Sequence, residues 1–588
     1  MLQHTVDPYA AALYCDFRST FRLVDKTAAA DATPSATNYN TNVSQLAQTH
    51  DGVEYSTAKY ATLEAGGWSL DGSCKIMPDS VSGVQTGLWT GLSGADGIFA
   101  TPPTLTFQFT SNHSSYGFTL LFDDKANWYP KSITLAAYNS TNALLGSKTI
   151  ACTSVRQIVD LSVTNYRKIV LTFNSTQAPF QRVRLTEAIF GIVEYHDKSN
   201  MPEATISYEI DPRMKEFPCG EMVQVIDNSD GRYNMQSPNS LYAYLQKGQP
   251  FNSNEIGLGL SADSLEYVNM GAQFYFAQAK ASNDSMAAEI TAYDLIYQLD
   301  KTKYRKGVWT GTYGTDTVSN LINAVLSDSG VGLQTNIPAD IGARVIGSII
   351  PIVSHREAIR MICEAARCVA FIGRSGALQL ATIVAGTPVD TLNGDNMTDW
   401  PEISVDDAVN TVEVDVYNYN SDATDETLYN ATMTINGTQD IWVEFDPTLN
   451  PSASISGGTL NSATYYFRAA KLNITANGAV TIAVTGRKAS ASKSVYSANN
   501  ITGDEAIQSY SIENELVLSN AVAAAIATYQ LGLSRITCPF TDMGNPAREL
   551  TDTVSISDAF GESSSAVVTK EKYTFDGGLA CEVEAVST

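Results

Sequence analysis

The sequence lacks most of the short motifs that mark catalytic sites. It has only five histidines, at positions 4, 50, 113, 196 and 355, and no two of them have the spacing of metal ligands on one helix or strand. HExxH, GxSxG, a Walker loop and a GxGxxG turn before a helix are all absent. A distant cysteine and histidine could still pair, but no local signature supports such a nucleophile. We therefore expect a protein that is not an enzyme, has no catalytic residues and uses no cofactor.

Basic residues are also scarce. The chain has 37 lysines and arginines against 62 acidic residues, a net charge of −25, and no run of basic residues. A field of this sign opposes binding to nucleic acid and to anionic membranes, so we predict no sequence-specific nucleic-acid binding. No apolar run of about 18 residues occurs, which predicts that no segment spans a membrane.

The eight cysteines are scattered, and none of them forms a CxxC pair. The N-terminus shows no basic stretch followed by an apolar core, as a signal peptide would. Together these features predict buried, reduced thiols in a protein that folds in a cytoplasm.

What the chain does have is many short strands. At 588 residues it is long enough for three to five domains. Apolar residues alternate with polar ones in Leu105–Phe109, Phe118–Phe122 and Ile169–Phe173, with no helical pattern between them. This alternation predicts an antiparallel sandwich or jelly roll over residues 52–203. The fold class is thus multidomain, β-rich and α+β.

Helical signals appear in the second half. Ser354 and Glu357 form a capping-box pattern, which predicts a helix with Ile359 and Ile362 on its buried face. Alternation returns around Ile441–Phe445 and Val480–Val484, which predicts a small β insertion. The expected domains are an N-terminal segment (1–51), the jelly roll (52–203), β-barrel and α+β domains (204–424), the insertion (425–503) and a C-terminal segment that completes the barrel (504–588).

Aromatic side chains near predicted loops are the first candidates for a binding site. Trp89, Trp128, Tyr129 and Phe180 lie there, and the first three are the candidate carbohydrate-binding residues because flat rings stack on sugars. The alternative is that these rings fill the sandwich core.

Adjacent acidic residues are the second candidates. Asp123 and Asp124 could bind calcium with nearby carbonyl oxygens, or they could form a solvated turn. A carboxylate pair for sugar hydrolysis would have to come from Asp123–Asp124 or from Asp406–Asp407. Neighbouring residues on a strand point to opposite faces, so neither pair converges easily on one substrate.

Three stretches resemble the baseplate hub, or tail-associated, proteins at the tip of phage tails. They are EITAYDLIYQLD (289–300), the Ser354–Cys368 helix with the Gly373–Leu380 hairpin, and a C-terminal run of Gly544–Pro546, Asp552–Val554 and Tyr573–Leu579. Thr551 stands where the family pattern usually has glycine. The strand pattern of residues 52–203, including Arg184–Tyr195, looks like a galactose-binding, discoidin-type jelly roll inserted into the hub.

The resemblance implies a structural hub protein of the virion, placed at the tail tip and assembled in the host cytoplasm. It implies a homotrimer whose barrel continues the tail tube. The implied partners are the distal tail protein, the tail tube, the tape-measure protein, tail-fibre or receptor-binding proteins, and host surface glycan as a further contact. Hubs often carry a peptidase or lysozyme domain, which we expect to be missing or to sit on another polypeptide because the sequence ends soon after the hub's last strand. A carbohydrate-binding adhesin and a cell-wall hydrolase remain as alternatives.

Overall fold

The chain is described by a computed structural model, in which the side chains of residues 252 and 253 are left out of the description. The described residues are 8–9, 14–52, 60–61, 71–72, 74–76, 86–237, 240–261, 264–270, 273–281, 286–308, 314–401, 403–405, 409–501, 507–533 and 536–587.

One large sheet of 15 strands, here called the main sheet, joins both ends of the chain. The strand order is β13-β1-β16-β18-β19-β15-β14-β38-β39-β36-β28, and β17, β27, β29 and β37 attach at its sides. Alternating apolar residues bury one face, as in β14, where Ala204, Ile206 and Tyr208 point inward. The strands are β1 (Tyr14–Val24), β13 (Gly191–His196), β14 (Glu203–Glu209), β15 (Glu221–Asp227), β16 (Pro250–Gly259), β17 (Glu266–Asn269), β18 (Phe274–Ala281), β19 (Ala287–Tyr293), β27 (Asp390–Leu392), β28 (Met397–Asp399), β29 (Ser404–Val405), β36 (Ile536–Asp542), β37 (Thr553–Ser557), β38 (Ser563–Phe575) and β39 (Leu579–Ser587).

Two further sheets enclose a separate core and form what we call the sandwich domain. Phe107, Leu135 and Phe173 are fully buried between them, as the alternation predicts. Every strand pair within these two sheets is antiparallel. One sheet has the order β2 (Thr33–Thr37), β6 (Thr104–Ser115), β11 (Val163–Thr176), β8 (Pro130–Tyr138) and β9 (Leu144–Ala151); the other has β10 (Arg156–Val159), β7 (Phe118–Phe122), β12 (Arg184–Ile189) and β5 (Leu88–Trp89). Short elements nearby are α1 (Ala28–Asp31), the 3-10 helix η1 (Leu46–Thr49), β3 (Tyr60–Ala61) and β4 (Lys75–Ile76).

The borders of the sandwich domain differ from the predicted 52–203. β2 pairs with β6, so residues 33–37, which were assigned to the N-terminal segment, belong to the sandwich. The expected end strand Arg184–Tyr195 divides: its first half forms β12 within the sandwich, whereas its second half forms β13, which pairs with β1 in the main sheet. The reason is that β1 and β13 are antiparallel neighbours, and the sandwich is inserted between them. Strand alternation cannot reveal which distant strand is the partner.

Helices cover one side of the main sheet. Ser354 Oγ accepts the Glu357 N–H at 3.1 Å, which confirms the predicted N-cap, while Glu357 itself pairs with Arg360. Asp294 caps the short helix after β19 by accepting the Ile296 N–H at 2.9 Å. The elements are α2 (Leu295–Leu299), α3 (Val318–Ser329), α4 (Ala339–Gly342) and α5 (His355–Ala366), with β20 (Lys303–Tyr304), β21 (Thr315–Thr317), β22 (Thr335–Asn336), β23 (Val345–Gly347), β24 (Val353–Ser354), β25 (Val369–Ile372) and β26 (Leu378–Ala381).

A long arm built on β34 forms the fourth part of the molecule. The 31-residue β34 pairs with β30 near its end and with three other strands along the rest of its length. Gly457 lets the chain turn tightly here, because its φ is +85° and a Cβ would lie 2.5 Å from the Ala479 carbonyl oxygen. α6 packs on β30 through Ala523 and Ile526. The elements are β30 (Thr411–Ser421), β31 (Glu426–Glu444), β32 (Thr448–Ser456), β33 (Thr459–Tyr465), β34 (Ala469–Asn499), β35 (Ser509–Ile512) and α6 (Asn520–Gly532).

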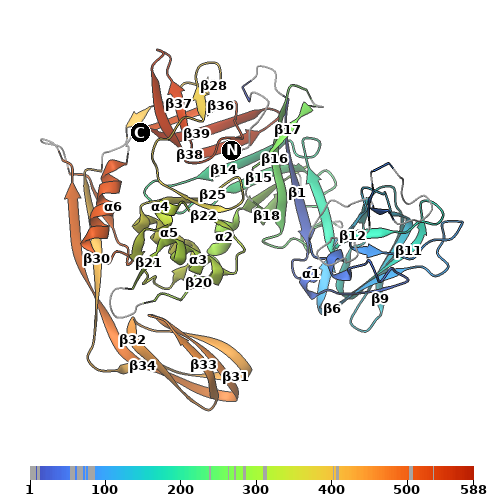
Figure 1. Ribbon diagram of the computed structural model, residues 1–588, viewed down its shortest axis with the longest axis horizontal. Coiled ribbons are helices and arrows are strands. Elements are labelled where there is room, and N and C mark those ends of the chain that lie inside the picture. The colour runs from blue at the N-terminus through green and yellow to red at the C-terminus, as the bar shows by residue number, and fades with distance from the viewer. Residues whose placement is uncertain are drawn as a thin grey trace.

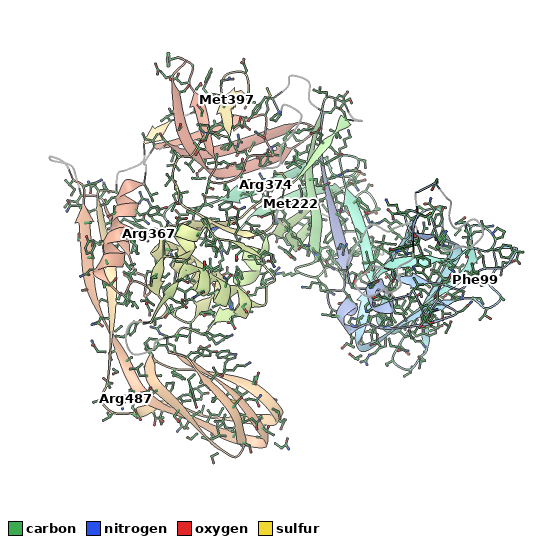
Figure 2. The ribbon with its side chains drawn as sticks, viewed as in Figure 1. Phe99, Met222, Arg367, Arg374, Met397 and Arg487 are labelled. Carbon is green, nitrogen blue, oxygen red and sulfur yellow. The ribbon has the colours of Figure 1, made fainter. Side chains whose placement is uncertain are left out.

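Figure 1 shows how the parts are arranged. The main sheet crosses the top of the view, with α2–α5 below it, the sandwich domain at the right and the β31–β34 arm at the lower left. In Figure 2, Phe99 marks the sandwich core, Met222 the main-sheet core, and Arg374 the junction between the main sheet and the helices. The prediction of a β-rich chain with several sheets is confirmed.

Candidate functional site

The two tryptophans predicted to stack on sugars are buried together. Trp89 is 2% exposed and Trp128 is 4% exposed, and their rings meet edge to face at 5.4 Å. The Arg184 guanidinium lies 5.2 Å from the Trp89 ring centre. These rings therefore pack inside the sandwich domain, which is the alternative reading of the sequence, and their faces are not open to a ligand.

Asp123 belongs to the same buried cluster. Its carboxylate lies 3.0 Å from Nη1 of Arg184 and accepts the Lys125 and Ala126 N–H groups. Asp124 instead lies half-exposed, 3.2 Å from Nζ of Lys125. Within the described residues, no group of three or more histidine, cysteine, aspartate or glutamate side chains is placed to hold a metal ion. Asp406 and Asp407 lie outside the described residues.

Tyr129 remains at the edge of the sandwich core. It is partly buried, and its hydroxyl donates to the Thr153 carbonyl at 3.4 Å. The ring is the one of the three predicted aromatics that keeps some accessible surface.

A cleft of about 360 Å³, lined by both polar and apolar groups, opens elsewhere on the sandwich domain. Asp96, Ile98, Lys131 and Gln177 are among its lining residues. The Gln177 amide donates to the carbonyls of Pro130 and Cys152 and so fixes the cleft wall. A carboxylate, an ammonium group and several hydroxyls around one cleft are groups that can bond to sugar hydroxyls.

Phe180 adjoins this cleft through Pro179, which lines it. Its side chain is 50% exposed, and its backbone has φ +54°, a left-handed conformation that costs energy for a residue with a Cβ. Its N–H donates to the Gly94 carbonyl, and Gly94 also accepts from Gly97. Of the four aromatics considered in the sequence, Phe180 is thus the one whose ring is presented to solvent. No pattern in the sequence indicates Asp96 and Lys131 as residues of this cleft, because only the fold brings them together.

A buried histidine ties the sandwich domain to the end of β1. His113 Nδ1 lies 2.9 Å from Oδ2 of Asp25, and Nε2 lies 2.8 Å from Oδ2 of Asp31. The Thr110 hydroxyl and the Ser111 N–H also bond to Asp31, and these hydrogen bonds hold the pKa of Asp31 below its usual value. We call Asp25, His113 and Asp31 the clip, and its role is structural because it joins two parts of the fold. His355 is structural as well, because its ring nitrogens bond to Thr302 and Asp328.

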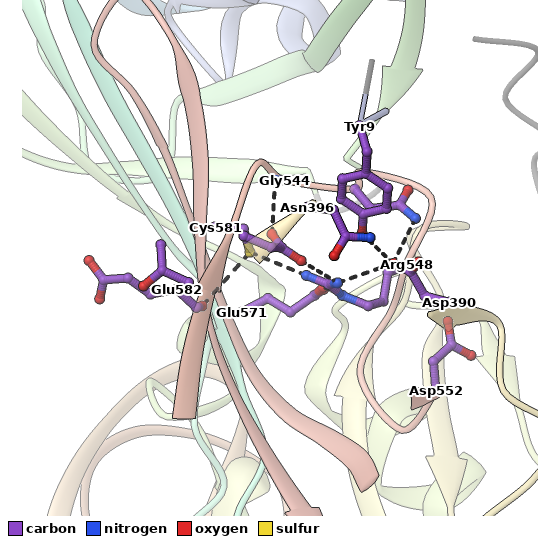
Figure 3. A network of polar contacts seen from close by, with 12 residues as sticks. Tyr9, Asp390, Asn396, Gly544, Arg548, Asp552, Glu571, Cys581 and Glu582 are labelled. Atoms are coloured by element: carbon purple, nitrogen blue, oxygen red, sulfur yellow. Dashed lines mark hydrogen bonds and ion pairs between the residues drawn. The ribbon is translucent and has the colours of Figure 1, made fainter. Parts of the chain in front are cut away.

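The main sheet encloses a network of charged residues around Arg548 (Figure 3). Arg548 is fully buried, and its guanidinium bonds to Asp542 at 2.6 Å, Glu571 at 2.8 Å and Asp390 at 3.3 Å. The Tyr9 hydroxyl donates to Asp390. Burial disfavours the charged guanidinium, yet the carboxylates of Asp542 and Glu571 raise the pKa of Arg548 above its usual value. The network therefore joins the start of the chain to its end.

Arg374 extends this network to the helices. Its Nη2 lies 3.3 Å from Oε2 of Glu571 and donates to the Arg548 carbonyl at 2.8 Å. Its guanidinium lies 5.0 Å from the Tyr208 ring centre and 5.6 Å from that of Tyr573. The β25–β26 hairpin is thus fastened to β38.

No helix among the described residues is both long and apolar enough to cross a membrane.

No family model and no curated protein matches the chain. Among solved structures, the prophage MuSo2 43 kDa tail protein from Shewanella oneidensis matches with 11% identity and a TM-score of 0.36, covering 65% of this chain and 93% of that one. The tail protein from Neisseria meningitidis matches with 12% identity and a TM-score of 0.39, covering 67% and 93%. The family 32 carbohydrate-binding module from C. perfringens NanJ, solved with galactose, matches with 13% identity and a TM-score of 0.19, covering 30% and 99%.

Proposed function

We propose that this chain is a structural hub subunit at the tip of a phage or phage-like tail. The observation that carries the proposal is that the three hub-like stretches fold into one core. Ile290 and Leu299 from the first, Ile359 and Leu378 from the second, and Phe575 from the third all belong to the same buried cluster. Stretches almost 300 residues apart in the sequence support one another, which favours a single inherited unit over chance resemblance.

The buried arginines strengthen this reading. Arg374 from the second stretch bonds to Glu571, which lies beside the third, and Arg548 bonds to the same carboxylate. A core fastened in this way gives a rigid frame, as a load-transmitting tail part requires. We expect the frame to form a homotrimer that joins the tail tube and distal tail protein to the tape-measure protein and to tail fibres.

Light scattering on the purified chain tests the proposal. The monomer mass is 63.3 kDa, so a trimer has three times this value, and electron microscopy of such particles should show a closed ring. A chain that stays monomeric at micromolar concentration would contradict a self-assembling hub.

The sandwich domain supports a second role, contact with host glycan. The Asp96–Lys131 cleft and the half-exposed Phe180 ring are the features that favour it. On a glycan array the chain should bind a sugar, and Phe180→Ala should lose that binding. Phe560→Ala is the matched control, because Phe560 is 92% exposed at the tip of the β37–β38 hairpin, away from the sandwich. Equal loss in both variants, or no binding by the wild-type chain, would count against this role.

The adhesin and hydrolase alternatives predict different results. A free adhesin binds glycan as a stable monomer, and a hydrolase clears peptidoglycan in a gel. The carboxylates that do gather in the described residues, Asp390, Asp542 and Glu571, are bound to the buried Arg548.

A further inference from the structure

Three lysines converge beside the junction of the sandwich domain and the helices. Lys26 follows β1, Lys247 precedes β16, and Lys301 follows α2. Nζ of Lys26 donates to the Lys247 carbonyl at 2.7 Å, and Nζ of Lys301 donates to Oε1 of Gln298 at 2.9 Å.

Gly248 lies between these groups. A Cβ built on it would be 3.1 Å from Nζ of Lys26 and 3.3 Å from Nε2 of Gln298. Lys26 and Gln298 therefore approach the same point of the backbone, and Lys301 bonds to the other end of the Gln298 amide. We call Lys26, Lys247 and Lys301 the lysine cluster.

The lysine cluster stands out in this acidic chain. Its three ammonium groups have no ion-pair partner among the described residues, although the chain has 62 acidic side chains against 37 basic ones. The carboxylates next to the cluster in the sequence are engaged elsewhere: Asp25 with His113 at 2.9 Å and Asp300 with Arg356 at 3.0 Å.

Grouping like charges without a counter-ion costs stability. Partial burial lowers the pKa of Lys301, and the charges of Lys26 and Lys247 lower it further. All three side chains are exposed, so nothing about packing requires them to be lysine. A local arrangement that opposes folding is typical of a binding site.

The neighbouring groups indicate the ligand. Nζ of Lys301 lies 4.7 Å from the centre of the Tyr297 ring. The centres of the Tyr293 and Tyr297 rings are 4.9 Å apart. Ammonium groups bind phosphate and carboxylate oxygens, while a tyrosine face and a Gln298 amide suit a sugar ring and its hydroxyls.

We propose that the lysine cluster binds the phosphate or carboxylate groups of an acidic glycan. Such a polymer is favoured over DNA, because the net charge of −25 repels a backbone with one charge per ~1.7 Å more strongly than a glycan with about one charge per sugar. The biological source of the ligand rests on the proposed glycan contact, whereas the anion site rests on the three lysines alone.

Fluorescence anisotropy with the full-length chain tests the site. The probes are labelled oligogalacturonate for carboxylate and phosphorylated dextran for phosphate, with unmodified dextran and double-stranded DNA for comparison. We expect binding to at least one acidic glycan, weakened by salt, and none to unmodified dextran. The triple variant Lys26→Gln, Lys247→Gln, Lys301→Gln should bind on the order of 100-fold more weakly, since each ammonium near an anionic surface contributes about fivefold.

Two kinds of control keep the result specific. Lys280→Gln removes the same charge from an exposed lysine that pairs with Glu289 at 3.0 Å, and it should leave the affinity unchanged. The three lysine-to-arginine substitutions keep the charge and should keep most of the binding. If the triple variant unfolds, the single substitution Lys301→Gln decides, with an expected loss of about fivefold.

Several outcomes would overturn the inference: no binding to either acidic glycan, equal binding by the triple variant, an equal loss with Lys280→Gln, or tighter lysine-dependent binding to DNA. The hub proposal is judged separately by mass. A monomer that still binds acidic glycan through these lysines would refute the hub and leave the site standing, and a trimer without such binding would do the reverse.

Discussion

Nη1 of Arg548 lies 2.6 Å from Oδ2 of Asp542, and both side chains are fully buried in the main sheet. A buried ion pair is weak evidence for added stability, because desolvation offsets the attraction between the charges. The pair instead connects distant parts of the chain. Asp542 lies at the end of β36, and Asp390 and Tyr9 bond into the same network from elsewhere in the sequence. Removing one partner leaves the other charges buried without compensation.

Arg548→Met should therefore destabilise the chain by about 3–5 kcal/mol. The measurement is chemical denaturation followed by circular dichroism. Lys572→Met is the control, because Lys572 is only partly buried and pairs with the exposed Glu582, and it should cost at most about 1 kcal/mol. Similar effects for the two substitutions would show that the buried network contributes no more to the free energy of unfolding than a surface ion pair does.

The acid side of the stability curve should depend on the Asp25–His113–Asp31 clip. Hydrogen bonds from Thr110 and His113 lower the pKa of Asp31, and although burial raises the pKa of Asp25, its hydrogen bonds to Thr27 and His113 lower it overall. A carboxyl group with a lowered folded-state pKa contributes stability above its unfolded pKa, here 3.8, and loses it as the pH falls through the folded value.

Asp31→Asn should thus lower the melting temperature at neutral pH and flatten its decline below about pH 4. Intrinsic fluorescence, to which the buried Trp89 and Trp128 contribute, follows the unfolding. Asp160→Asn serves as the matched control, since Asp160 is exposed and pairs with Lys148 at 3.5 Å. An unchanged acid profile in Asp31→Asn would refute the role of the clip.

Local features were predictable because they depend on neighbours in the sequence. The alternation around Phe107 and Leu171 identifies strands, and Ser354 with Glu357 marks where α5 begins. Partners at long range were not: the pairing of β13 with β1 follows from the whole sheet and not from the residues of either strand.

The binding-site residues could not be identified from the sequence for the same reason, because their positions depend on contacts with distant residues. Trp89 and Trp128 were ambiguous because a loop tryptophan can point either way, and Arg184 with Asp123 holds both inward. The lysine cluster carried no signal either, since Lys26, Lys247 and Lys301 are separated by more than 50 residues at each step and meet only in the fold.

Phe180 offers a test that separates binding from stability. Its φ of +54° costs an L-residue about 1–2 kcal/mol relative to glycine, a strain more often found at functional sites. Phe180→Gly should therefore raise the free energy of unfolding by about 1 kcal/mol while abolishing the binding of a sugar at the Asp96–Lys131 cleft. Phe560→Gly should change neither beyond a few tenths of a kcal/mol. A clear loss of stability in Phe180→Gly would show that the ring packs in the fold instead of serving a ligand.

Gly191 marks the place where the sandwich domain returns to the main sheet. It opens β13 beside β1, and a Cβ there would lie 2.3 Å from the Leu23 carbonyl oxygen and 2.7 Å from Cα of Val24. Backbone atoms cannot yield as the tip of a flexible side chain can, so the two strands would have to separate.

Gly191→Ala should destabilise the chain by about 1–3 kcal/mol or more. Gly332→Ala is the control, because nothing lies within 4 Å of its Cβ position, and its effect should be small. Differential scanning fluorimetry compares the two, and limited proteolysis should cut Gly191→Ala first near the junction of the two domains. If Gly191→Ala proved as stable as Gly332→Ala, the tight approach of β1 and β13 would not be what fixes the sandwich domain to the main sheet.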